Sequence, residues 1–230
     1  MSSFLNTTST VTTTTRLPAD ITKADVLSVL RDDNTMLKLN PLNKSSTKLP
    51  PSSSTAFYKS VPKDLKPASA DAIENIPVYC VVEASGPEGE ESGNSWRGGW
   101  AKRFIPDEIT YETSFQAHDY GMFQITHAPM GVQSSTKWII REAKESDPVV
   151  EAVGKTGLVL EQNGEVTSNR MLMGFIKTTL QSSYDQLAKD FIAMVEKEMA
   201  KKRGDVETSE AEKAATVDKH TDQAGAGVVG

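Results

Sequence analysis

The feature that most constrains this chain is a long amphipathic segment in its C-terminal part. Between Ser168 and about Arg203, apolar and aromatic residues recur at spacings of three and four, the period of one face of an α-helix. The stripe consists of Met173, Ile176, Leu180, Tyr184, Leu187, Phe191 and Met194, followed by Glu198. An apolar stripe of this length has to be buried against another element. The strand-rich middle of the chain is the candidate partner.

The residues before this helix predict an antiparallel sheet. Residues 109–118 alternate between apolar and polar side chains, and the β-branched run 8–17 predicts the first strand. Further strands are predicted over 55–61, 77–84, 122–127, 136–142 and 157–160. Turn residues such as Pro129-Met130-Gly131 separate several of these strands, and short connections are typical of antiparallel neighbours. Two polar stretches, 43–54 and 63–75, are predicted to be loops.

Two short helices are predicted after the first strand. Thr22, with Asp25 three residues later, forms a variant capping box for a helix over 22–31. A second short helix carries Met36 and ends before Pro41, because the residue before a proline disfavours the helical conformation. The predicted fold class is therefore α+β, with an antiparallel sheet packed on a long C-terminal helix.

Composition divides the chain into one domain with two tails. The domain is predicted to span 8–203, with a disordered N-terminus over 1–7 and a disordered C-terminal tail over 204–230. Within the domain, residues 86–95 form an acidic, glycine-rich turn that is predicted to be mobile.

Charge and composition exclude several classes of function. The net charge of −6 argues against a nucleic-acid binder, which would show a basic stripe. Cys80 is the only cysteine, so an intramolecular disulfide and a cysteine-based zinc site are ruled out, and we predict no metal site and no cofactor. No apolar run approaches the roughly 20 residues that span a bilayer, and the first residues lack the features of a signal peptide. We therefore expect a cytoplasmic protein without a transmembrane segment.

Several stretches carry a resemblance to a known family. They are Val26–Leu42 with its ending Met36-Leu37-Lys38-Leu39-Asn40-Pro41-Leu42; Ile109–Glu112 through Phe115–Asp119; Ala128–Val132 with Lys137-Trp138; and Gly157–Glu161 through Asn169 and Met171–Leu180. In order and spacing they resemble an uncharacterised fungal family, a domain of unknown function with a START-like, Bet v 1-like or polyketide-cyclase-like fold. The resemblance covers roughly residues 8–200.

This resemblance implies a helix-grip fold, in which a curved antiparallel sheet wraps around the long C-terminal helix. It also implies a cavity between sheet and helix. Most members of the superfamily bind lipids, sterols or polyketide-like molecules there, and a minority are enzymes. The family supplies no catalytic residues.

A set of side chains is predicted to line the space between sheet and helix. The set is Tyr111, Phe115, Phe123, Ile125, Trp138, Ile140, Met173, Ile176, Leu180 and Tyr184. Such residues fill a solid core in most domains, and the residues alone leave both outcomes open. The resemblance and the adaptable side chains of Met171, Met173 and Met194 favour a cavity.

Charged residues near the predicted cavity are candidates for a polar rim. Arg103, Lys137 and Arg141 are cations that can bind a carboxylate or phosphate head group. The alternative is ordinary charge exposed to solvent.

We predict non-catalytic binding or carriage of a hydrophobic small molecule, such as a lipid or a polyketide-like compound. One alternative is a cyclase-like or dehydratase-like enzyme with His118 or His127 as base and Tyr111 as donor, which requires a histidine facing the cavity. Another is an interaction protein with a solid core and no cavity, whose protein partners the sequence leaves unknown.

Overall fold

The computed structural model describes residues 6–84, 108–144, 147 and 157–222, with side chains described as far as residue 204. Its centre is a seven-stranded antiparallel sheet in the order β1-β7-β6-β5-β4-β3-β2. The strands are β1 (Asn6–Arg16), β2 (Asn43–Lys48), β3 (Val78–Ala84), β4 (Glu108–His118), β5 (Gly121–Ala128), β6 (Val132–Glu142) and β7 (Leu158–Asn169).

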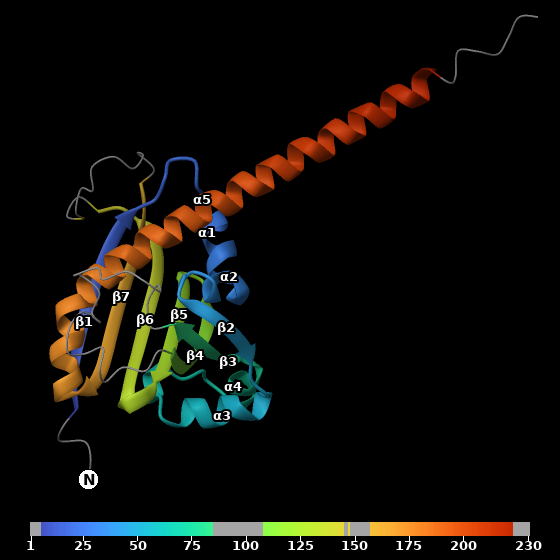
Figure 1. Ribbon diagram of the computed structural model, residues 1–230. Helices are drawn as coiled ribbons and strands as arrows, with labels where there is room; N and C mark the ends of the chain where they lie inside the picture. Colours follow the sequence, from blue (N-terminus) through green and yellow to red (C-terminus); the bar gives the residue numbers. More distant parts are fainter. Residues whose placement is uncertain (1–5, 85–107, 145–146, 148–156, 223–230) are drawn as a thin grey trace, which may run out of the picture.

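The helices are α1 (Lys23–Leu30), α2 (Asp33–Leu37), α3 (Pro51–Lys59), α4 (Ala70–Asn75) and α5 (Arg170–Asp222), with short 3-10 turns η2 (Lys63–Leu65) and η4 (Pro129–Gly131). The capping box predicted for α1 is confirmed, because Thr22 and Asp25 bond each other's backbone N–H groups. α5 lies diagonally over β1 and β7, passes α1 and continues beyond the sheet (Figure 1). The strand order and this long helix confirm the predicted helix-grip fold.

The pairing register assigns each side chain of the sheet to one of two faces. Met122, Trp138 and Gln162 stand opposite one another across β5, β6 and β7, and the Trp138 ring contacts Phe191 of α5. We call this side, which faces α5, the inner face. Ser114 of β4 points the other way and bonds Tyr58 of α3, and we call that side the outer face.

The larger hydrophobic core lies on the inner face, at the end of the sheet near α1 and α2. Trp138 and Ile140 of β6 belong to one buried cluster with Phe191 and Val195 of α5. The segment around α1 and α2 completes this cluster with Leu17, Ile21, Val26, Val29, Leu30, Met36, Leu37 and Leu39. Burial of apolar surface, at roughly 25 cal/mol per Å2, is the main force that holds α5 and the two short helices against the sheet.

A second layer of helix covers the outer face, and the sequence does not predict it. Phe57, Tyr58 and Val61 of the α3 segment form a buried cluster with Phe123 and Ile125. The buried cluster therefore joins this layer to β5. The molecule has helices on both sides of the sheet, where the sequence predicts them on one.

The predictions for residues 43–75 are corrected by this layer. The predicted strand over 55–61 is largely the helix α3, and the predicted loop over 43–54 contains β2. β-branched and aromatic residues favour a strand locally, but the buried residues Ser54, Phe57 and Tyr58 share one side of the helix α3. Burial of that side against the sheet decides the outcome.

Three predicted boundaries also differ from the structure. β7 continues to Asn169 rather than ending at 160, and β1 begins at Asn6, which pairs with Asn169. α5 continues to Asp222, through part of the segment 204–230 that the sequence predicts to be a disordered tail. That stretch is rich in Ala, Glu and Lys, which are strong helix formers. The predicted mobile turn 86–95 lies outside the described residues.

Candidate ligand-binding site

α5 is attached to the inner face by a buried tyrosine. The Tyr184 hydroxyl lies 2.6 Å from the Thr136 hydroxyl of β6, and the Tyr184 side chain is buried. Its ring rests on Gly164 of β7, where a Cβ atom would stand 2.3 Å from the tyrosine oxygen. Gly164 is therefore required for the close approach of the ring to the strand.

A second polar contact joins α5 to the edge strand. Thr13 of β1 donates a hydrogen bond to Asp185 at 3.0 Å, and Gln181 donates one to Thr13 at 3.1 Å. Gln181 also donates to Asp185, so the three side chains form a closed triangle. These bonds fix the helix over β1 and β7.

Uncharged polar side chains cross the middle of the inner face. We call this set the neutral belt, and it consists of Thr113, Gln124, Thr126, Ser134, Thr136 and Gln162. Thr113 and Thr136 are buried, and Thr113 bonds both Thr126 and the Ile125 carbonyl. The belt is a row of neutral donors and acceptors between apolar residues.

Three buried polar groups on the inner face have no hydrogen-bond partner within the part of the chain that the structure describes. They are the Trp138 indole N–H, both amide atoms of Gln162 and the Ser168 hydroxyl. Trp138 and Gln162 are directly opposite each other on β6 and β7, and both side chains are 0% exposed. A buried polar group without a partner costs about 1–3 kcal/mol. Such groups are rare in folded proteins and call for an explanation.

Part of the inner face is only half-buried. We call it the open zone: Tyr111, Gln124, Thr126 and Ser134 of the sheet, and Ile176 and Leu180 of α5. Nearer to α1, the inner-face residues Phe115, Trp138 and Ile140 are buried instead. Burial raises the pKa of the Tyr111 hydroxyl, and the Glu83 carboxylate adds to the increase. Tyr111 therefore stays protonated at neutral pH and can donate a hydrogen bond.

The predicted cavity residues divide between the two faces. The inner face or the facing side of α5 carries Tyr111, Phe115, Trp138, Ile140, Met173, Ile176, Leu180 and Tyr184. Phe123 and Ile125 belong instead to the outer cluster under α3, so their predicted inward placement is wrong. In residues 122–127 both alternate sets contain apolar side chains, Met122 in one and Phe123 and Ile125 in the other, so without the register the sequence does not indicate which set faces inward.

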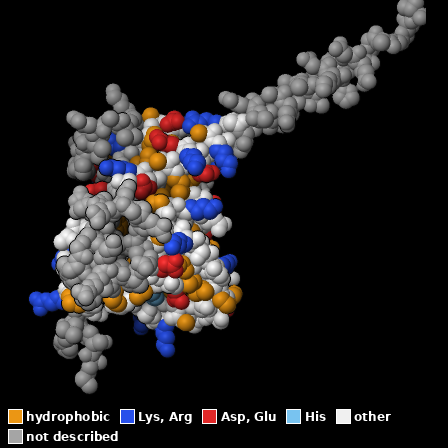
Figure 2. Space-filling model, viewed as in Figure 1, with side chains coloured by type: hydrophobic (Ala, Val, Ile, Leu, Met, Phe, Trp, Pro, Cys, Tyr) orange, Lys and Arg blue, Asp and Glu red, His pale blue; other side chains and the backbone are white. Residues whose placement is uncertain are grey.

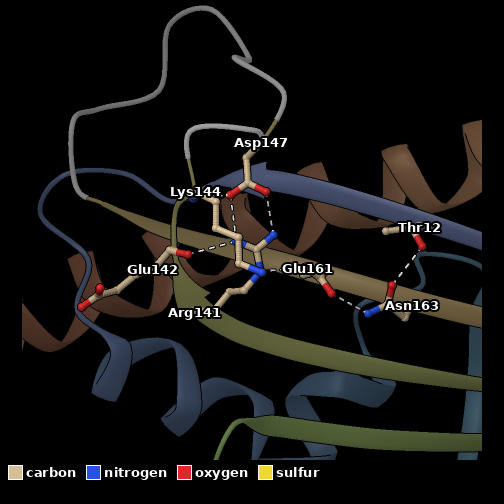
Figure 3. Close-up of polar contacts among 7 residues, drawn as sticks. All are labelled: Thr12, Arg141, Glu142, Lys144, Asp147, Glu161 and Asn163. Atoms are coloured by element: carbon tan, nitrogen blue, oxygen red, sulfur yellow. Dashed lines mark hydrogen bonds and ion pairs between the residues drawn. The ribbon is translucent and has the colours of Figure 1, made fainter.

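The predicted cationic rim is not found on the inner face. Arg141 lies on the outer face and donates to Asp147 through both terminal nitrogens, at 2.7 Å each, and to Glu161 at 2.7 Å (Figure 3). Its charge is thus already matched by two carboxylates. Lys137 also projects from the outer face, and Arg103 lies outside the described residues.

The Arg141 contacts extend into a chain of bonds across three strands. Asn163 donates to Glu161 at 2.7 Å and accepts from Thr12 at 2.9 Å (Figure 3). Hydrogen bonds from Arg141 and the Lys144 backbone lower the pKa of the Asp147 carboxyl. Burial acts to raise the pKa of Glu161, but hydrogen bonds from Asn163 and Arg141 outweigh it and lower that pKa. This network holds β6, β7 and β1 together on the outer face.

The two candidate histidines also lie on the outer face. His127 stacks on Phe57 of α3 with ring centroids 4.2 Å apart, and His118 stacks on Tyr120 at 4.8 Å. His127 pairs with Glu112, six residues from His118 along β4, which corresponds to about 20 Å. The register therefore separates the histidines from each other and from Tyr111 on the inner face. The enzyme alternative loses the inward-facing histidine that it requires.

A groove is present on the outer face. Its volume is about 420 Å3, and its walls include Pro62, Asp64 and Leu65 from the η2 segment and Ser135, Lys137 and Glu165 from the sheet. An adjoining hollow reaches His127 and Gln133. Both signs of charge line the groove, so it shows no preference for one class of ion.

The sequence does not indicate the most unusual residues of the inner face. Gly164 belongs to the pair Asn163-Gly164, which is typical of turns, and Gln162 directly precedes that pair, so the strand is predicted to end before them. The alternation of Leu158, Leu160, Gln162, Gly164 and Val166 is the signal that indicates the longer strand.

Two further observations concern the described residues alone. No helix there is long and apolar enough to cross a membrane, and no group of three or more His, Cys, Asp or Glu side chains is arranged to hold a metal ion. The exposed side of α5 carries charged side chains, among them Lys189, Glu196 and Lys197 (Figure 2).

The sheet order, the C-terminal helix and the partly apolar inner face define a domain of the helix-grip class. The chain belongs to the family described as Domain of unknown function (DUF7053), whose profile matches residues 6–197.

Solved structures with a similar fold have little sequence in common with this chain. Ara h 8.0201 is 12% identical over 83% of this chain and 97% of that protein, with a TM-score of 0.41. The di-domain ARO/CYC protein BexL from the BE-7585A biosynthetic pathway is 12% identical over 82% of this chain, with a TM-score of 0.43. The match covers 48% of BexL. No curated protein matches the sequence.

Proposed function

We propose that this protein binds a hydrophobic small molecule between the inner face of the sheet and α5, without chemical conversion. The main supporting observation is the open zone, where Ile176 and Leu180 of α5 and inner-face residues of β4, β5 and β6 are only half-buried. Side chains that pack into a solid core are normally buried, as they are nearer to α1. An apolar molecule placed here gains free energy by covering this surface.

The ligand class that we propose is a lipid or a polyketide-like compound, and the role is carriage or sequestration. Neither role requires a catalytic residue, and the outer-face positions of His118 and His127 favour a binding role over an enzymatic one. A cytoplasmic location, a fungal source and the absence of nucleic-acid binding stay predictions from the sequence.

The first experiment is native mass spectrometry of the full chain, followed by organic extraction and mass analysis of any compound that co-purifies. The second is a titration with Nile red, a neutral apolar dye whose fluorescence rises on burial. We expect saturable binding of the dye.

A matched pair of variants locates the binding site. Gln124→Trp places an indole in the open zone, and Gln133→Trp places the same group on the outer face. We expect Gln124→Trp to weaken dye binding about tenfold or more, which corresponds to ~1.4 kcal/mol, and Gln133→Trp to leave it unchanged. Circular dichroism confirms that both variants are folded. Absence of saturable dye binding, or equal effects of the two variants, rejects the proposal.

A further inference from the structure

Building on the proposed function, we infer that the ligand is uncharged and carries a hydroxyl or carbonyl oxygen, which Gln162 and Trp138 bind. The same geometry disfavours ligands that carry a carboxylate. The ligand class is thereby narrowed from any apolar molecule to neutral oxygenated ones, such as alcohols, ketones and esters.

The first argument is the pair of unpartnered groups. Trp138 and Gln162 occupy opposed positions on β6 and β7, where Cβ atoms are about 5 Å apart. Between them they offer an indole N–H, an amide NH2 and an amide oxygen, none of which has a partner within the described chain. One ligand oxygen between the two side chains can accept from both, and a ligand hydroxyl can also donate to the amide oxygen.

The second argument is the path to this pair. Gln124 in the open zone stands opposite Thr136, and Thr136 is two residues from Trp138 on the same face of β6. The neutral belt therefore leads from the half-buried surface to the buried pair. The rings of Trp138 and Phe191 lie 5.2 Å apart, so the proposal requires the Phe191 ring to move for a ligand oxygen to reach the pair.

The third argument is the distribution of charge. Among the inward positions of β4, β5, β6 and β7, the one charged residue is Glu142, at the end of β6. On α5, the acidic Asp185 accepts a hydrogen bond from the inner-face residue Thr13. Lys137 and Arg141 project from the opposite face. A carboxylate beside Trp138 and Gln162 would lose its hydration without gaining a cation from these four strands, which is strongly unfavourable.

The test compares dodecanol, laurate and dodecane, which share the same chain length and differ in the terminal group. Each is used at neutral pH to displace Nile red from the full-length protein. We expect dodecanol to displace the dye at a concentration about tenfold below that of laurate, because the alcohol keeps its hydrogen bonds and the carboxylate lacks a counter-ion.

Two adjacent residues provide a variant and its control. Gln162→Leu removes the buried amide, and Asn163→Leu removes the neighbouring amide on the outer face, which bonds Thr12 and Glu161. We expect Gln162→Leu to weaken dodecanol about fivefold to tenfold, to leave dodecane unchanged and to raise the Tm of the ligand-free protein. Asn163→Leu is expected to lower the Tm and to keep the preference for dodecanol.

The possible outcomes separate this inference from the proposed function. Equal displacement by dodecanol and laurate overturns the inference while the binding function stands. A lower Tm for Gln162→Leu with an unchanged preference assigns Gln162 a purely structural role and overturns it as well. If Nile red itself does not bind, the proposed function fails first. Trp138→Phe, which keeps a ring and loses the N–H, tests the same preference if Gln162→Leu does not fold.

Discussion

The hydroxyl groups of Tyr184 and Thr136 lie 2.6 Å apart and form a buried hydrogen bond between α5 and β6. The bond forms where α5 passes from the open zone to the hydrophobic core near α1. This hydrogen bond therefore contributes to the free energy that holds α5 against the inner face.

Removal of one partner of this bond is expected to destabilise the protein. Tyr184→Phe leaves the buried Thr136 hydroxyl without its partner, so the free energy of unfolding should fall by about 1–2 kcal/mol. Thr136→Val should cost a similar amount, and the double variant less than the sum of the two. Urea unfolding of the four proteins measures the coupling energy. Strictly additive effects would show that the bond does not form in solution.

Gly164 is expected to tolerate no side chain. Gly164→Ala places a methyl group where the Tyr184 ring rests, so the ring must shift away from the strand. We expect a loss of about 1–3 kcal/mol in unfolding free energy, typical of overpacking, and reduced burial of the tyrosine in ultraviolet difference spectra.

Gly174 is the matched control for this substitution. It lies in α5, and a Cβ atom there meets no other atom within 4 Å. Gly174→Ala should therefore stabilise the protein by about 0.5–1 kcal/mol, because alanine loses less conformational freedom in a helix. The opposite order of stability for the two variants would contradict the structure around Tyr184.

The Arg141 network predicts a sensitivity to acid. The pKa values of Asp147 and Glu161 are lowered in the folded protein, so these groups bind fewer protons than in the unfolded chain. Their stabilising effect is complete above the unfolded pKa of about 4 and is lost as the pH falls below it. Wild type should exceed Arg141→Met in urea midpoint at neutral pH, and the difference should shrink in acid. A difference that is constant with pH would exclude the network as its cause.

His127 predicts a second pH effect in a milder range. Burial lowers its pKa in the folded protein, and the opposing Glu112 counteracts this only in part. The unfolded chain therefore takes up the proton first, so stability falls as the pH drops below the unfolded value of about 6.5. His127→Gln should flatten this dependence between neutral and mildly acidic pH. An imidazole pKa above the ordinary value, measured by NMR, would contradict the buried stack on Phe57.

The same variant bears on the enzyme alternative. His127 lies on the face opposite the open zone, so His127→Gln is expected to leave Nile red binding unchanged. A loss of dye binding in a folded variant would place the histidine nearer to the ligand than the structure does.

The sequence predicts elements whose signal is local and periodic. The stripe of α5 and the alternation of β4 are of this kind, and so is the capping box at Thr22. These signals suffice for the fold class because a long amphipathic helix and several short antiparallel strands have few ways to bury each other's apolar sides.

The site could be predicted only in part, because it depends on the register. Each strand residue faces α5 or α3 according to pairings that the sequence does not specify. Phe123 and Trp138 are both buried aromatic residues in neighbouring strands, yet they lie on opposite faces. The sequence does not indicate Gln162, because only the fold shows that this neutral side chain is buried and lacks a hydrogen-bond partner within the described chain.

The sheet is covered on both faces, by α5 with α1 and α2 on the inner face and by the α3 segment on the outer face. Ser114 bonds Tyr58, and Gln116 donates a hydrogen bond to the Leu65 carbonyl. These outward-facing polar side chains of β4 are therefore covered by the segment between β2 and β3, which contains α3, η2 and α4. Deletion of this segment would remove the hydrogen-bond partners of Ser114 and Gln116 and would expose Phe123 and Ile125 to solvent. We therefore expect that the sheet and α5 alone do not fold, and that a stable form of this domain requires all three layers.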